Sequence, residues 1–164
     1  MDKLYLFTDG SVHVQSKIGY GACLLLAEKD LAADRLEQLV RTKRFKNTSS
    51  TKLELQTLLW ALSELPPDGQ QIFIYTDSQN ITQLMERRRR LEDKNFCSKS
   101  GKPLKNADMY KQFYKVVDAL NCEMVKVQGH RPSRLKNEIE RIFTIVDKAS
   151  RKALRSETSR LKSS

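Results

Sequence analysis

Short apolar runs alternate with amphipathic segments along most of the chain. Five runs rich in β-forming residues predict strands, over residues 4–8, 19–26, 39–46, 71–76 and 123–127. Four segments with apolar residues three and four positions apart predict helices, over residues 52–64, 78–90, 107–120 and from beyond Pro132 to about Leu154. Strand–helix alternation after an initial three-strand meander predicts an α/β fold, in which a mixed sheet carries helices on both faces.

The length and composition predict an ordinary folded protein. The 164 residues suit one domain, which we place at residues 1–155, with a polar C-terminal tail at 156–164 that we expect to fray. No apolar run approaches the ~20 residues that span a bilayer, and Met1 leads at once into the first predicted strand. The three scattered cysteines lack Cys-x-x-Cys spacing. We therefore expect a cytoplasmic monomer with no leader, membrane contact, disulfide or structural zinc.

Two of the predicted strands stop at an aspartate. The first runs into Asp9 and the fourth into Asp77, and small turn residues follow each. A desolvated carboxylate is costly unless it is paired or holds a cation, although a single such aspartate is commonly a turn cap. A right-handed crossover through the helix at 52–64 would set the two strands parallel and place both acids at the same sheet edge.

Two helical acids can join this pair. Asp147 falls beside the apolar stripe of the last helix, at the boundary between core and solvent. Glu54 lies in the first turn of its helix, where stabilisation by the helix dipole explains it when it is taken alone. Together, several carboxylates are what a hard divalent cation requires, and a cation makes clustered acids tolerable.

The charge of the chain points to a polyanionic partner. Thirty Lys and Arg residues against twenty Asp and Glu give a formal net charge of +10. Such a surplus favours nucleic acid, although solvated lysine faces can produce it too. Converging acids in a basic protein suggest phosphodiester hydrolysis by two divalent ions, which activate a water and stabilise the leaving oxygen.

Four ordered motifs surround these acids. They are Phe7-Thr8-Asp9-Gly10-Ser11, Thr51-Lys52-Leu53-Glu54-Leu55, Tyr75-Thr76-Asp77-Ser78-Gln79 and Val127-Gln128-Gly129-His130, with Asp147 downstream. Together they resemble the motif series of type 1 ribonuclease H, and the likeness extends from Leu4 to about Leu154. It implies a ribonuclease H-like fold, with strands one to three antiparallel and strands four and five parallel to the first. It also implies an endonuclease that hydrolyses the RNA strand of RNA–DNA hybrids.

The resemblance assigns roles to individual residues. Asp9, Glu54, Asp77 and Asp147 correspond to the four acids that hold two Mg²⁺ ions, with Mn²⁺ able to substitute. His130 corresponds to a mobile histidine that relays protons or helps product leave, a task suited to an imidazole that titrates near neutrality. Residues expected to contact the 2′-hydroxyls and phosphates are Ser49, Ser50, Thr51 and Gln79, with helix capping an equally good explanation for the two serines.

A basic segment from Arg87 to Lys105 resembles the protrusion, or handle, with which the family grips DNA. Its run of four arginines, Arg87, Arg88, Arg89 and Arg90, can neutralise phosphates. The alternative is a solvated helix face, but consecutive arginines repel one another unless an anion lies nearby. Handles in the family often carry tryptophans, whereas Phe96 is the only aromatic residue of this segment, so we expect backbone electrostatics to outweigh base stacking.

The chain departs from the family pattern in two places. Residues 12–17 replace a glycine-rich turn, and the interval from His130 to Asp147 is longer than usual by about two helical turns. Two alternative functions use the same fold. One is a DNA-acting nuclease of the resolvase or transposase kind, and the other is an inactive nucleic-acid-binding module. The basic handle and the full set of four acids favour hybrid cleavage over both.

Overall fold

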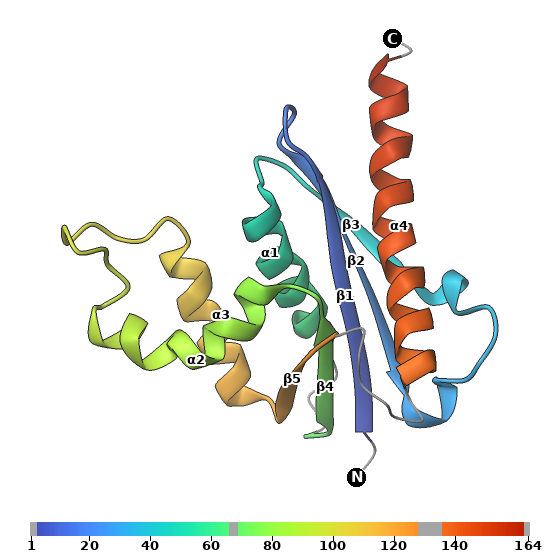
Figure 1. The fold of residues 1–164 in the computed structure, drawn as a ribbon, viewed down its shortest axis with the longest axis horizontal. Coiled ribbons are helices and arrows are strands. Elements are labelled where there is room, and N and C mark those ends of the chain that lie inside the picture. The colour runs from blue at the N-terminus through green and yellow to red at the C-terminus, as the bar shows by residue number, and fades with distance from the viewer. Residues whose placement is uncertain (1–2, 66–68, 128–135, 163–164) are drawn as a thin grey trace.

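Five strands form one mixed sheet at the centre of the protein (Figure 1). The computed structural model describes residues 3–65, 69–127 and 136–162. The strands lie in the order β3-β2-β1-β4-β5, in which β1 pairs antiparallel with β2 and β2 with β3, whereas β4 is parallel to β1 and β5 to β4. Their bounds are β1 Lys3–His13, β2 Ile18–Ala27, β3 Arg41–Phe45, β4 Gln71–Thr76 and β5 Cys122–Lys126. The predicted fold class and strand directions are confirmed.

Helices cover both faces of this sheet (Figure 1). Successive residues of a strand point to opposite faces, so Leu6 of β1 joins the core beneath the first three helices while Tyr5 and Phe7 join the core beneath the last. In the second core, Ile142 and Val146 of the last helix are completely buried. The helices are α1 Ser50–Ser63, α2 Gln79–Asp93 and α3 Ala107–Ala119 on one face, and α4 Lys136–Lys162 on the other.

The first strand is longer than its apolar run predicts. It continues through Asp9 to His13 because a long antiparallel hairpin with β2 supplies hydrogen-bond partners for this polar stretch, down to the pair His13↔Ile18. The prediction that Asp9 ends a strand is therefore wrong, although the parallel pairing of β1 with β4 does stop two residues earlier, at Phe7↔Tyr75. Two short 3₁₀ turns, η1 Glu28–Asp30 and η2 Leu36–Leu39, precede β3 and carry no periodicity that predicts them.

The last helix is also longer than predicted. It does not stop near Leu154 but continues to Lys162, past the end of the sheet and alongside the β1–β2 hairpin (Figure 1). Glu157 fixes this extension, because its carboxylate accepts a hydrogen bond from Tyr20 Oη at 2.8 Å and pairs with Arg44. The expected frayed tail is thus helical as far as Lys162, while the domain boundary at residue 155 stays a prediction.

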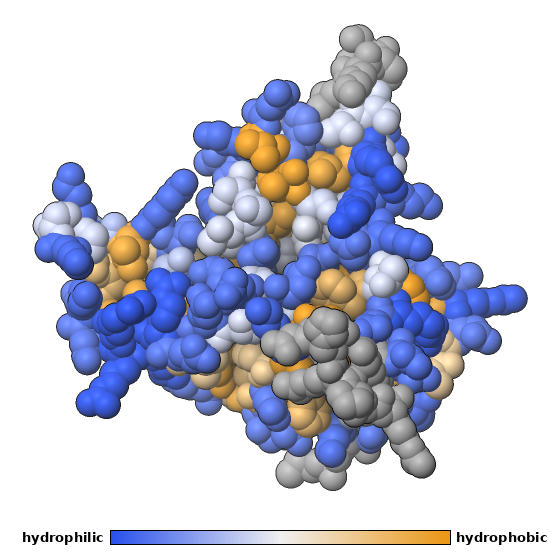
Figure 2. Space-filling model, viewed as in Figure 1, coloured by the Kyte–Doolittle hydropathy of each residue, from blue (hydrophilic) through white to orange (hydrophobic). Residues whose placement is uncertain are grey.

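The described surface is predominantly hydrophilic on the face shown in Figure 2, including the regions of α2 and α4. This agrees with the 30% charged residues of the chain. None of the helices that the structure describes combines the length and the apolar content needed to cross a membrane.

Candidate active site

The sheet topology brings Asp9 and Asp77 to corresponding positions. Phe7 of β1 and Tyr75 of β4 form the last parallel pair, and each aspartate follows its strand's member of that pair by two residues. The prediction that these acids lie side by side, where the parallel pairing of the two strands ends, therefore holds for the backbone. Glu54 reaches this edge from α1 and Asp147 from α4, so both faces of the sheet contribute an acid.

The four carboxylates influence one another's charge. The pKa of Asp9 is raised to about 8, first by burial, then by a hydrogen bond with Asp147 and by the charge of Asp77. Partial loss of hydration raises the pKa of Asp77, and the charge of Asp147 adds to this. Burial raises the pKa of Glu54 as well, with Asp77 contributing further. With its pKa raised to about 8, Asp9 retains a proton near neutral pH and can donate it in the hydrogen bond with Asp147.

Glu54 is oriented by a residue that the sequence motifs contained but did not single out. Ser78 Oγ donates a hydrogen bond to Glu54 Oε2 at 2.6 Å and accepts one from the backbone N–H of Ile81 at 3.2 Å. Ser78 therefore caps α2 and at the same time links the junction of β4 and α2 to the catalytic face of α1. The hydrogen bond from Ser78 also opposes the rise in the pKa of Glu54.

Two glycines let α1 approach the β1–β2 hairpin closely. A Cβ atom at Gly21 would stand 2.2 Å from Thr57 Oγ1, and one at Gly10 would stand 2.9 Å from Leu53 Cδ2. A Cβ at Gly21 would force Thr57 to shift, and a Cβ at Gly10 would press on the side chain of Leu53, the residue before Glu54. The glycine of the Asp-Gly-Ser motif thus has a packing role.

Asp147 lies half-buried within α4. Arg151 Nε, one turn further along, donates a hydrogen bond to Asp147 Oδ1 at 3.1 Å. On the same helix, Ser150 is fully buried and its Oγ lies 3.0 Å from Ser11 Oγ on β1. This serine pair joins α4 to the strand that carries Asp9. Sequence reasoning missed it, because a serine in an amphipathic helix carries no signal of burial.

The donor set of this cluster fits a divalent cation in its chemistry. Carboxylate oxygens are the ligands that Mg²⁺ prefers, and the charge of Asp77 adds to the effect of burial in raising the pKa of Asp9. Within the described residues, no three Asp, Glu, His or Cys side chains are already drawn into a metal-binding arrangement. A cation would therefore have to draw the carboxylates together against their repulsion.

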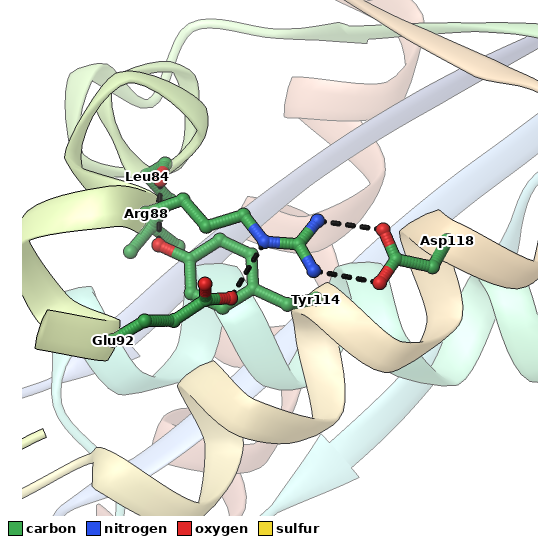
Figure 3. Close-up of polar contacts among 5 residues, drawn as sticks. All are labelled: Leu84, Arg88, Glu92, Tyr114 and Asp118. Carbon is green, nitrogen blue, oxygen red and sulfur yellow. Dashed lines mark hydrogen bonds and ion pairs between the residues drawn. The ribbon is translucent and has the colours of Figure 1, made fainter. Parts of the chain in front are cut away.

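The arginine run of α2 is partly engaged within the protein (Figure 3). The two terminal nitrogens of Arg88 each donate to a carboxylate oxygen of Asp118 on α3 at 2.6 Å, and Arg88 Nε donates to Glu92 at 2.7 Å. The guanidinium also lies 4.9 Å from the ring centroid of Tyr114. Arg88 keeps the pKa of the Asp118 carboxyl below its usual range. Asp118 and Glu92 thus supply the anions for one of the four consecutive arginines, Arg88.

The other predicted contact residues differ in their surroundings. Arg89 and Arg90 are exposed, whereas Arg87 is half-buried and its Nε has no partner among the described atoms. Ser49 is the N-cap of α1 and accepts a hydrogen bond from the backbone N–H of Lys52 at 3.3 Å, which confirms the capping role. Exposed residues that stay candidates for substrate contact are Ser50, Thr51 and Gln79. His130 lies outside the described residues, and Phe96 is buried against Tyr114.

Comparison with known proteins gives a consistent picture. The RNase H family model matches residues 1–154. Proteins named ribonuclease H from two strains of Clostridium botulinum, Hall and ATCC 19397, are each 23% identical over 148 residues, which cover 87% of this chain and 93% of the relative.

Two solved structures share the fold. Foamy viral protease-reverse transcriptase in complex with dsDNA gives a TM-score of 0.64 at 12% identity, over 91% of this chain and 93% of that chain. The same kind of protein in complex with an RNA/DNA hybrid gives a TM-score of 0.64 at 12% identity, over 92% of this chain and 19% of that chain. The family match spans nearly the whole sequence and includes all four acids, and it confirms the prediction of a ribonuclease H-type hydrolase. The chain belongs to the RNase H family.

Proposed function

We propose that this protein is a metal-dependent endonuclease that hydrolyses the RNA strand of RNA–DNA hybrids with two Mg²⁺ ions. The observation that carries the proposal is the convergence of Asp9, Glu54, Asp77 and Asp147 from four different elements, with the pKa of Asp9 raised to about 8. A purely structural role would not favour four mutually repelling acids at one sheet edge.

The relatives support the choice of substrate. Both bacterial proteins are named ribonuclease H, and one of the similar viral structures contains an RNA/DNA hybrid. The net charge of +10 suits a duplex with phosphates on both strands. Exposed Arg89 and Arg90 offer positive charge on α2, and the exposed Ser50, Thr51 and Gln79 offer groups that can hydrogen-bond a 2′-hydroxyl.

The chain's own residues prepare the site for this chemistry. Asp9, Glu54, Asp77 and Asp147 would hold the ions, which supply an activated water and stabilise the leaving oxygen when bound. Ser78 fixes the direction of the Glu54 carboxylate. The proton on Asp9 has to leave before its carboxylate can serve as an anionic ligand, and Arg151 has to release Asp147 Oδ1. His130 would relay a proton or assist product release, as its counterpart in the family does.

One comparison of substrates tests the proposal. An RNA–DNA hybrid, duplex DNA and duplex RNA of one sequence are incubated with the protein, with and without Mg²⁺. We expect cleavage of the RNA strand of the hybrid alone, only with Mg²⁺, and none by Asp9→Asn or Asp77→Asn. Preferential cleavage of duplex DNA would instead establish a DNA-acting nuclease of the same fold. Binding without any cleavage would leave the protein as an inactive nucleic-acid-binding module.

A further inference from the structure

The part of α4 beyond Asp147 carries a row of basic side chains that the proposed function does not use. Lys148, Arg151, Lys152 and Arg155 are all exposed, and we call them the α4 basic stripe. Their spacing of three and four residues places them on one face of the helix, next to Asp147. In Figure 2 the region of α4 that rises beside the hairpin shows strongly hydrophilic residues on its surface.

The helix that carries the stripe is held against the sheet on a different face. Ser150 contacts Ser11 of β1, and Glu157 binds Tyr20 of β2 and Arg44 of β3. Ser150 and Glu157 are seven residues apart and so share a face, which looks toward the strands. The stripe is therefore presented by a fixed helix and directed away from the face that anchors it.

The positive charge of the stripe is largely uncompensated. After Asp147, Glu157 is the only acid in the sequence up to residue 164, and it is engaged by Tyr20 and Arg44. Within the part of the chain that the structure describes, Arg151 pairs with Asp147, and no ion pair involves Lys148, Lys152 or Arg155. Like charges three and four residues apart destabilise a helix. Arg88 on α2 differs, because Asp118 and Glu92 neutralise it.

The dimensions of the stripe fit a nucleic-acid backbone. From Asp147 to Arg155 the helix rises about 12 Å, at ~1.5 Å per residue. Phosphates of one strand follow one another at ~3.4 Å along a duplex axis, so the stripe spans roughly three of them. The stripe begins at Lys148, directly after Asp147 of the carboxylate cluster. A nucleic-acid backbone held at that cluster would therefore meet the stripe by continuing along the helix.

We propose that the α4 basic stripe binds phosphates of the RNA–DNA hybrid adjacent to the cleavage site. This inference rests on the proposed function and adds to it a second basic surface, on the opposite sheet face from the arginines of α2. The two surfaces would hold the duplex from both sides of the carboxylate cluster. A solvated helix face, which is the other common role of such charges, would make no difference to hybrid binding.

A pair of double variants tests the stripe. Lys152→Gln/Arg155→Gln removes two of its charges without touching Asp147 or Arg151. Lys29→Gln/Lys115→Gln removes two exposed charges from η1 and α3. It serves as the matched control, because the two double variants have the same net charge. Ca²⁺ replaces Mg²⁺ in this measurement, so that the hybrid is not cleaved. The affinity of each variant for the hybrid is measured from ~50 to ~200 mM salt, a range in which phosphate contacts are strongly screened.

We expect the stripe variant to bind the hybrid several-fold more weakly than the control at low salt. Its slope of log affinity against log salt should be less negative by about 1.8, from ~0.9 per lost phosphate contact. Turnover at saturating hybrid should be unchanged in the control variant. Shortening the hybrid from the end that lies over α4 should abolish the difference between them, whereas shortening the other end should preserve it.

The same series separates this inference from the proposed function. If the parent protein cleaves the hybrid with Mg²⁺ while both variants keep identical affinities and slopes, the stripe is a solvated face and the inference is wrong. If the parent protein cleaves no hybrid, the proposed function is wrong, and the inference about a hybrid at the cleavage site is wrong with it. A thermal unfolding curve for each variant establishes that the compared proteins are folded.

Discussion

The residue with the greatest effect on the site is Asp9, because it is both the most strongly perturbed acid and a member of the central strand. Its raised pKa has a consequence for stability as well as for chemistry. In the unfolded chain an aspartate titrates near ~3.9. In the folded protein Asp9 keeps its proton until about pH 8. Without metal, the folded state therefore binds more protons than the unfolded state between these pH values, and stability falls as the pH rises through this range.

Asp9→Asn should remove this dependence. The neutral amide has the shape of the protonated acid, so the variant should be more stable than the parent in EDTA. The difference should grow from nothing near pH 4 to at most about 4 kcal/mol at pH 7, at ~1.36 kcal/mol per pKa unit. Urea unfolding at several pH values measures it. A parent protein whose stability does not change between pH 5 and 8 would contradict the raised pKa of Asp9.

Two serines of similar local role offer a second test at this scale. Ser49 caps α1 and Ser78 caps α2, but only Ser78 also binds Glu54. Each change to alanine should cost about 1 kcal/mol of stability through the lost cap. Ser78→Ala should in addition lower kcat, because Glu54 loses its orienting donor. Ser49→Ala should leave kcat unchanged and raise KM if Ser49 also contacts the substrate. Equal kcat values in the two variants would show that the Ser78–Glu54 hydrogen bond has no catalytic role.

At the scale of elements, the strands and helices follow from the hydrophobic pattern, and the errors have a common cause. The extension of β1 beyond Thr8 depends on pairing with β2, and the end of α4 depends on Glu157 meeting Tyr20 and Arg44. Both stretches are polar, and another element orders each of them: the neighbouring strand of the hairpin for β1, and residues more than 100 positions away for α4. The hydrophobic periodicity of a segment indicates only which of its own side chains are buried. For the same reason the sequence identified the acids of the site but not the Ser78–Glu54 and Ser11–Ser150 contacts that orient their elements.

The arrangement of α2 against α3 depends on one arginine of the basic run. Because Arg88 binds Asp118 and covers Tyr114, it holds the helix that leads into the handle, while Arg89 projects into solvent. Arg88→Ala should lower the melting temperature by a few degrees, and Arg89→Ala should leave it unchanged. Arg89→Ala should instead make the salt dependence of hybrid binding less steep, by ~0.9 in the log–log slope if it contacts a phosphate. The reverse assignment of these two effects would show that Arg88 faces the substrate.

At the scale of the whole molecule, the carboxylate cluster is a junction. Asp9 and Asp77 come from the sheet, Glu54 from the layer of α1 to α3, and Asp147 from α4, so three layers meet where their negative charges repel. The fold tolerates this repulsion because an apolar core on each face of the sheet holds the layers together. A divalent ion bound at the junction would connect the layers and convert repulsion into attraction. Global stability should therefore report on metal binding.

Mg²⁺ should raise the melting temperature of the parent protein, since a ligand that binds only the folded state stabilises it by about 2.7 kcal/mol at a hundred times its Kd. The rise should be larger at pH 8 than at pH 6, because the ions compete with the proton that Asp9 carries. NaCl at equal ionic strength controls for screening of the repulsion, and Asp77→Asn, which lacks one ligand, should respond to Mg²⁺ much less than the parent. If NaCl reproduces the whole effect in the parent, the acids only repel one another and do not bind the metal.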